Sequence, residues 1–155
     1  DLTVITPIRF CENETVNLLL SSFVDKMKKQ DIILNIKVAL PAELNIPDTE
    51  LCSVLSNGLE NALNATNKIE DNTLRKVFFD CNINRKMLLI EIENAYTGHI
   101  QMDGKIPTST EIGHGYGCKS IHSIVKKRNG FCTFQAVDGV FTLRLVLPMD
   151  TQSYI

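Results

Sequence analysis

The chain has 155 residues, of which 44% are hydrophobic and 22% are charged, and its formal net charge is -2. This size and balance predict one globular domain with a core of its own, and the negative charge without a basic run excludes a general nucleic-acid-binding surface. No apolar stretch approaches the roughly 20 residues of a membrane span, and residues 1–7 lack the features of a signal peptide. We therefore expect the chain as given to be soluble, with no direct membrane contact.

The spacing of apolar residues predicts the elements in chain order. Residues 1–13 are irregular, with a short edge strand expected near Val4 and Ile5. A helix is predicted over 14–30, a strand over 32–38, and a second helix from an N-cap at Asp48 to Asn67. A hairpin over 76–82 and 87–94 follows, then a helix over 117–128 and two strands over 131–137 and 140–147. This order predicts an α+β fold, a two-layer sandwich in which three main helices cover one face of a mixed, mainly antiparallel sheet.

Residues 95–116 differ from the rest of the chain because they combine glycine and polar residues with almost no apolar periodicity. A stretch of this length without regular structure inside a compact domain is usually functional or disordered. Because residues 95–112 have few apolar anchors, we expect this segment to be mobile when no ligand is bound.

The second predicted helix carries an unusual stripe of amide side chains. Asn57 and Asn61 are four residues apart and Asn64 is three further on, so all three lie on one helical face. Asparagine is a poor helix former, and three on one stripe indicate a polar site. We interpret this stripe as the floor of a pocket for a nucleotide and a metal ion.

Two further clusters support such a pocket. The run Gly113-His114-Gly115-Tyr116-Gly117 opens directly into a helix, whose free N–H groups and dipole suit phosphate oxygens, although the same run could be a flexible turn. It does not follow a strand, as a dinucleotide-binding fingerprint does. Asn94 ends a strand just before the glycine-bearing loop, where it could bind the edge of a base or simply cap the strand.

Five widely separated cysteines, odd in number and without a C-x-x-C pair, are typical of reduced, mostly buried thiols in a cytoplasmic protein. The three histidines, His99, His114 and His122, have no metal-ligand spacing among themselves or with the thiols. The sequence therefore favours neither a disulfide framework nor a zinc site.

The three polar clusters, in this order, resemble the ATP-binding catalytic domain of sensor histidine kinases, in the GHKL ATPase superfamily with its Bergerat-type fold. Four segments resemble the quorum-sensing kinases of the accessory-gene-regulator type, namely Phe10-Cys11-Glu12-Asn13, Val16-Asn17, Leu19-Leu20-Ser21 and Gly113 to Ile121. The resemblance covers residues 1–155 as a single catalytic domain. It implies that the sensor domain and the dimerisation domain with the phosphoacceptor histidine are absent from this chain.

The resemblance also implies roles for individual residues. Asn61 matches the asparagine that binds Mg²⁺ between the ATP phosphates, and Asn57 matches the asparagine one turn earlier. Residues 95–112 match the mobile ATP lid. The remaining matches are glycine-box and adenine-site residues, namely Asn94, Gly98, Gly113, Gly115, Tyr116, Gly117 and Thr142.

Three departures from the family pattern bear on the chemistry. Asn94 replaces the aspartate that accepts the adenine amino proton, a role that an amide oxygen can still fill. Asn64 stands where many of these kinases have a phosphate-contacting lysine, so positive charge is expected from Mg²⁺ and from Lys68, Lys105 or Lys119. Asn57 replaces the glutamate base of the hydrolase branches, which disfavours steady ATP hydrolysis.

The resemblance thus implies a protein histidine kinase domain that binds ATP and Mg²⁺ and phosphorylates a histidine in a separate dimerisation domain. Its parent would be a membrane-anchored two-component sensor kinase with this domain in the cytoplasm, acting indirectly on a response regulator. Glu60 is a candidate for proton removal from the acceptor, or else a solvated side chain. Two alternatives remain open, a GHKL serine kinase of the anti-sigma type and a non-catalytic nucleotide-binding interaction module.

Overall fold

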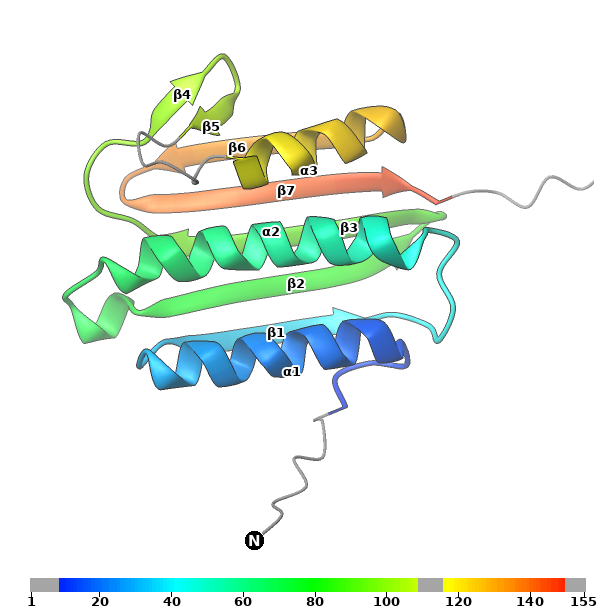
Figure 1. The fold of residues 1–155 in the computed structure, drawn as a ribbon, viewed down its shortest axis with the longest axis horizontal. Coiled ribbons are helices and arrows are strands. Elements are labelled where there is room, and N and C mark those ends of the chain that lie inside the picture. The colour runs from blue at the N-terminus through cyan, green and yellow to red at the C-terminus, as the bar shows by residue number, and fades with distance from the viewer. Residues whose placement is uncertain (1–8, 109–115, 150–155) are drawn as a thin grey trace, which may run out of the picture.

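The computed structural model describes residues 9–108 and 116–149, shown in Figure 1. Within these residues, the helices and the main strands follow one another in the predicted order. The expected strand near Val4 and Ile5 lies outside the described residues. The elements are α1 (Glu14–Lys29), β1 (Ile33–Ala39), α2 (Asp48–Asn67), a short 3-10 turn (Asn72–Leu74), β2 (Lys76–Asn84), β3 (Met87–Ala95), β4 (Gln101–Asp103), β5 (Ile106–Thr108), α3 (Tyr116–Lys127), β6 (Phe131–Val137) and β7 (Val140–Pro148).

Five strands form one mixed sheet in the order β1-β2-β3-β7-β6. β1 and β2 are parallel because the chain crosses over through α2 between them, and the other neighbours in this sheet are antiparallel. The three described helices lie side by side on one face of the sheet, and the other face has no helix (Figure 1). The predicted α+β sandwich is confirmed.

The core lies between the helices and the inward-facing residues of the central strands. In β3 and β7 every second residue is buried, as alternation in a sheet with one covered face requires. Helix α2 comes very close to these strands at Gly58. A Cβ added at Gly58 would lie 2.7 Å from Cδ1 of Ile92 and 3.2 Å from Cδ2 of Leu143. The absence of a side chain at Gly58 therefore lets α2 lie directly on β3 and β7.

Two polar side chains fix where the helices begin and end. Asn13 caps α1 and accepts a hydrogen bond from the N–H of Val16. Arg75, just before β2, donates to backbone carbonyls at the ends of both α1 and α2, including Gln30, Thr66 and Ile69. These bonds satisfy carbonyls that a helix end leaves without partners.

Helix α2 begins one position away from the prediction. Pro47 occupies the N-cap position, Asp48 is the first helical residue, and no side chain caps this end by a hydrogen bond. Asp48 and Glu50 in the first turn still suit the positive end of the helix dipole.

The segment expected to lack regular structure contains a small hairpin, which corrects that part of the prediction. β4 and β5 are antiparallel strands of three residues each, joined at Gly104, whose φ of +63° favours glycine. Pro107 in β5 is buried, and β5 packs against α3. Among the described residues, no helix is long and apolar enough to cross a membrane.

Candidate functional site

The amide stripe on α2 is half-buried, as a polar site at the edge of a core requires. Asn57, Asn61 and Asn64 each keep part of their surface exposed. The Nδ2 of Asn57 donates to Oγ of Ser53 at 3.2 Å, which leaves its Oδ1 free of that bond. Within the described part of the chain, the side chains of Asn61 and Asn64 make no hydrogen bond. Their amide oxygens are therefore available to a ligand.

The start of α3 meets this stripe directly. A Cβ added at Gly117 would lie 3.3 Å from Oδ1 of Asn57, which is tighter than most real Cβ contacts, so the absence of a side chain at Gly117 lets the two residues approach closely. The structure thus brings Gly117 together with Asn57 of the amide stripe. Gly113, His114 and Gly115 lie outside the described residues, and so does the side chain of Tyr116.

Asn94, at the end of β3, provides an unusual acceptor. Its side chain is only 2% exposed, and its Nδ2 donates to the backbone oxygen of Ala95 at 2.9 Å. Its Oδ1 is buried and has no hydrogen-bond partner in the structure. An unpaired buried acceptor costs free energy on the order of 1–3 kcal/mol, so a ligand that supplies a donor there is favoured. The buried oxygen of Asn94 is therefore the acceptor with which a ligand could pair.

The register of the sheet corrects the placement of Thr142. Thr142 pairs with Glu93 on β3, whereas the residue opposite Asn94 is Phe141. Because side chains alternate along a strand, Phe141 shares the helix-covered face with Asn94, and Thr142 lies on the other face. Thr142 is therefore not brought together with the amides. The alternation of Phe141, Leu143, Leu145 and Leu147 was the signal that could have shown this.

The remaining candidates are on the surface. Gly98 is exposed, with a φ of +77° and open space around it, and Glu60 is exposed on α2. Lys68, Lys105 and Lys119 are also exposed.

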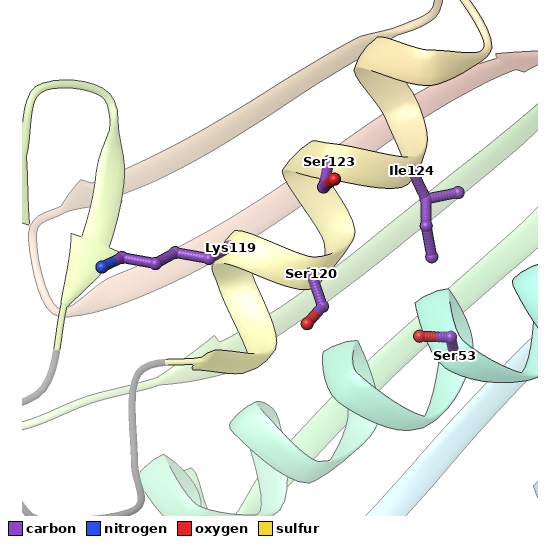
Figure 2. Close-up of a pocket in the computed structure, with 5 residues that line it drawn as sticks. All are labelled: Ser53, Lys119, Ser120, Ser123 and Ile124. Carbon is purple, nitrogen blue, oxygen red and sulfur yellow. The ribbon is translucent and has the colours of Figure 1, made fainter.

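An open groove of about 420 Å³ lies between α2 and α3. Figure 2 shows Ser120 and Ile124 on the side of α3 that faces α2, opposite Ser53, while Lys119 extends toward the β4–β5 hairpin. The groove adjoins the amide stripe through Ser53, whose Oγ accepts the hydrogen bond from Asn57. Its lining residues are Ser53, Lys119, Ser120, Ser123 and Ile124.

The donor set limits which cations could bind. No cluster of three or more His, Cys, Asp or Glu side chains is present among the residues that the structure describes. Burial raises the pKa of Cys81 to about 12 and that of Cys118 to about 11, so these thiols stay protonated at neutral pH. Amide oxygens such as Asn61 Oδ1 fit a hard ion that keeps most of its waters and shares phosphate oxygens, which describes Mg²⁺.

Comparisons with known proteins agree with this geometry. A family model described as a GHKL domain matches residues 46–148. The catalytic domain of histidine kinase ThkA, in a nucleotide-free form, superposes with a TM-score of 0.68 at 16% identity, over 88% of this chain and 91% of that one. The Acinetobacter baumannii histidine kinase AdeS superposes with a TM-score of 0.61 at 15% identity, over 88% of this chain. This chain covers 64% of the AdeS chain. No curated protein matches.

Proposed function

The chain belongs to the GHKL domain family, and from this we propose that it binds ATP with Mg²⁺ and supplies the γ-phosphate to a histidine in a separate domain of its parent kinase. The observation that carries the proposal is the buried, unpartnered Oδ1 of Asn94 at the end of β3. It lies on the helix-covered face of the sheet, where Gly117 of α3 also meets Asn57 of α2.

Asn94 would select the base. One N–H of its Nδ2 donates to the carbonyl of Ala95 and its oxygen has no partner, so that oxygen would accept a hydrogen bond from the exocyclic amino group of adenine. Guanine presents a carbonyl at the corresponding position, which would face another acceptor. The pocket therefore discriminates against GTP through an unfavourable pair of acceptors.

The phosphates would lie between α2 and the start of α3. The backbone at Gly117 opens a helix of 12 residues, whose free N–H groups and dipole favour anions. The amide oxygen of Asn61 is the group that would hold Mg²⁺, and Asn57 lies one turn nearer to Gly117. When bound, Mg²⁺ would neutralise phosphate charge that the amide side chains of this stripe cannot neutralise.

The site favours transfer of the phosphoryl group over hydrolysis. Asn57 has an amide, which cannot take a proton from water, and Glu60 is exposed to solvent on α2. Positioning and charge stabilisation supply most of the catalysis in phosphoryl transfer, so a separate domain can bring the nucleophile. We infer that this domain carries the acceptor histidine, and that the parent is a two-component sensor kinase acting on a response regulator.

The subgroup proposal, a quorum-sensing kinase of the accessory-gene-regulator type, draws support from the segment before α1. Asn17 is buried, and its Oδ1 accepts hydrogen bonds from the backbone N–H groups of Phe10 and Cys11 at 2.8 and 2.9 Å. Its Nδ2 donates to the Cys11 carbonyl at 2.7 Å. These bonds give a structural reason for the residue pattern that the resemblance rests on.

Phosphorylation of the full-length protein tests the proposed function. With ATP labelled at the γ-phosphate, we expect label that is lost in acid and retained in base, the behaviour of phosphohistidine. Acid-stable label would instead support the serine-kinase alternative. Nucleotide binding without any label would contradict the kinase and leave the non-catalytic binding module.

A further inference from the structure

Strand β6 forms one end of the five-stranded sheet. It pairs with β7 on one side, and no strand among the described residues pairs with its other side. Its seven residues, Phe131–Val137, contain no charge and no proline, and its register with β7 runs without a bulge. Edge strands in monomeric proteins usually contain a charged residue, a proline or a bulge, and each of these hinders pairing with another chain. The opposite edge strand, β1, carries Lys37.

The turn between β6 and β7 determines which backbone groups of β6 point outward. Asp138 and Gly139 have φ values of +51° and +78°, as in a type I′ turn, so Val137 and Val140 form the hydrogen-bonded pair that closes the hairpin. Hydrogen-bonded and non-hydrogen-bonded pairs alternate along an antiparallel ladder. The backbone groups of Cys132, Phe134 and Ala136 therefore point away from β7.

Apolar side chains flank this free edge on the helix-free face of the sheet. Phe131 is 74% exposed and Val137 is 50% exposed, at the two ends of the strand. Thr133 and Gln135 lie between them on the same face and are also exposed. A strand added here would find apolar contacts on this face.

On the helix-covered face of the sheet, basic side chains of α3 lie near the free edge of β6. Helix α3 buries one stripe, Cys118, Ile121 and Val125, against the sheet, and Ser120 and Ile124 face α2 across the groove in Figure 2. The remaining stripe, at i, i+3 and i+7, consists of Lys119, His122 and Lys126. Lys126 and His122 lie on the β6 side of the helix, and Lys119, at its start, extends toward the β4–β5 hairpin. Lys119 and Lys126 are exposed.

We propose that the free edge of β6 binds an extended segment of a partner protein, which adds a strand to the sheet. Its side chains would alternate, acidic toward the Lys119–Lys126 stripe and apolar toward Phe131 and Val137. A second copy of the chain fits this edge less well. Pairing of two β6 strands about a two-fold axis would place the basic stripes of both α3 helices next to each other, and their like charges would repel. The proposal does not depend on nucleotide binding.

A synthetic octapeptide of alternating valine and glutamate, with blocked ends and a fluorescent label, tests this surface in anisotropy titrations with the whole chain. We expect saturable binding, and no binding of a peptide with lysine in place of glutamate. Methylating every second amide nitrogen removes the donors that pair with the strand edge, so that peptide should also fail to bind. Equal binding of the methylated or the lysine peptide would overturn the proposal, as would no binding of the glutamate peptide at about 1 mM.

Variants of the chain locate the peptide. Lys126→Glu should weaken binding of the glutamate peptide at least about fivefold, whereas Lys28→Glu, an exposed site on α1, changes net charge equally and should leave it unchanged. Ala136→Pro removes an outward N–H without removing a bond to β7 and should also weaken binding. Equal effects of the two lysine variants would overturn the proposal. So would sedimentation showing that the chain dimerises and loses its dimer in Ala136→Pro.

Discussion

The Oδ1 of Asn57 lies against the backbone of Gly117, so the amide stripe of α2 and the first turn of α3 share one surface. The two residues are 60 positions apart in sequence. They lie so close in the structure that a Cβ at Gly117 would come within 3.3 Å of that oxygen. The contact joins the amide stripe and the end of the glycine run. The sequence gives the order of these two motifs along the chain but not their contact in space.

Gly117→Ala should therefore weaken nucleotide binding. The added methyl group must push Asn57 aside by a few tenths of an ångström, and we expect the affinity for Mg-ATP to fall about three- to tenfold. Thermal unfolding should change little, since alanine suits a helix. The matched control is Ser120→Ala, which changes α3 within the groove one turn later. Unchanged affinity in Gly117→Ala would show that this contact does not border the nucleotide.

Arg75 is expected to matter for stability and not for binding. Its guanidinium donates to carbonyls at the ends of α1 and α2, including Thr66 at 3.2 Å and Ile69 at 2.6 Å. Arg75→Ala leaves those carbonyls without this partner, so we expect the free energy of unfolding to fall by about 2–4 kcal/mol in urea titrations. Lys76→Ala, at the exposed next residue, should cost less than about 0.5 kcal/mol. Similar losses in both would contradict this role.

Glu50 makes stability depend on pH. The hydrogen bond from Arg128 Nη2 at 2.8 Å is the main cause that holds the pKa of Glu50 below its usual value, and burial opposes it. A carboxyl whose pKa is lowered on folding stabilises the fold above its unfolded pKa, and this contribution is lost as pH falls through the folded pKa. Glu50→Gln should therefore lower the melting temperature at pH 7 but not in strong acid. A difference that persisted below both pKa values would contradict the ion-pair explanation.

The segment from Gly98 to Gly104 should exchange its amide hydrogens fast. It has exposed residues and open space at both glycines, and the hairpin strands have only three residues each. We expect exchange there to be much faster than in β3 when no nucleotide is present, with partial protection at Pro107's neighbours, which pack toward α3. Exchange as slow as in β3 would show that this segment is not mobile.

Strong periodicity made the helices and the main strands predictable. The helix over 48–67 and the strands around Asp138-Gly139 were placed within a residue or two because apolar residues recur at the periods of 3.6 and 2. The β4–β5 hairpin was missed, since three-residue strands give no periodic signal. Thr142 was matched to an adenine-site residue through the resemblance alone, whereas the alternation along β7 places it on the face away from Asn94.

Contacts between distant residues could not be predicted in this way. Arg75 bonds to Gln30, 45 residues away, and Arg128 to Glu50, 78 residues away. No local sequence pattern identifies such partners, because they depend on how the helices pack on the sheet. The same holds for the buried, unpartnered oxygen of Asn94, which the sequence predicted only as a polar group at a strand end.

Calorimetric titration of ATP into the chain and its variants, with Mg²⁺ and with excess chelator, tests the proposed Mg-ATP site on the amide stripe of α2. We expect ATP to bind with Mg²⁺, GTP to bind at least about tenfold more weakly, and Asn61→Ala to abolish binding, while Asn35→Ala on the opposite sheet face binds normally. ATP binding that is unchanged in Asn61→Ala would contradict the account.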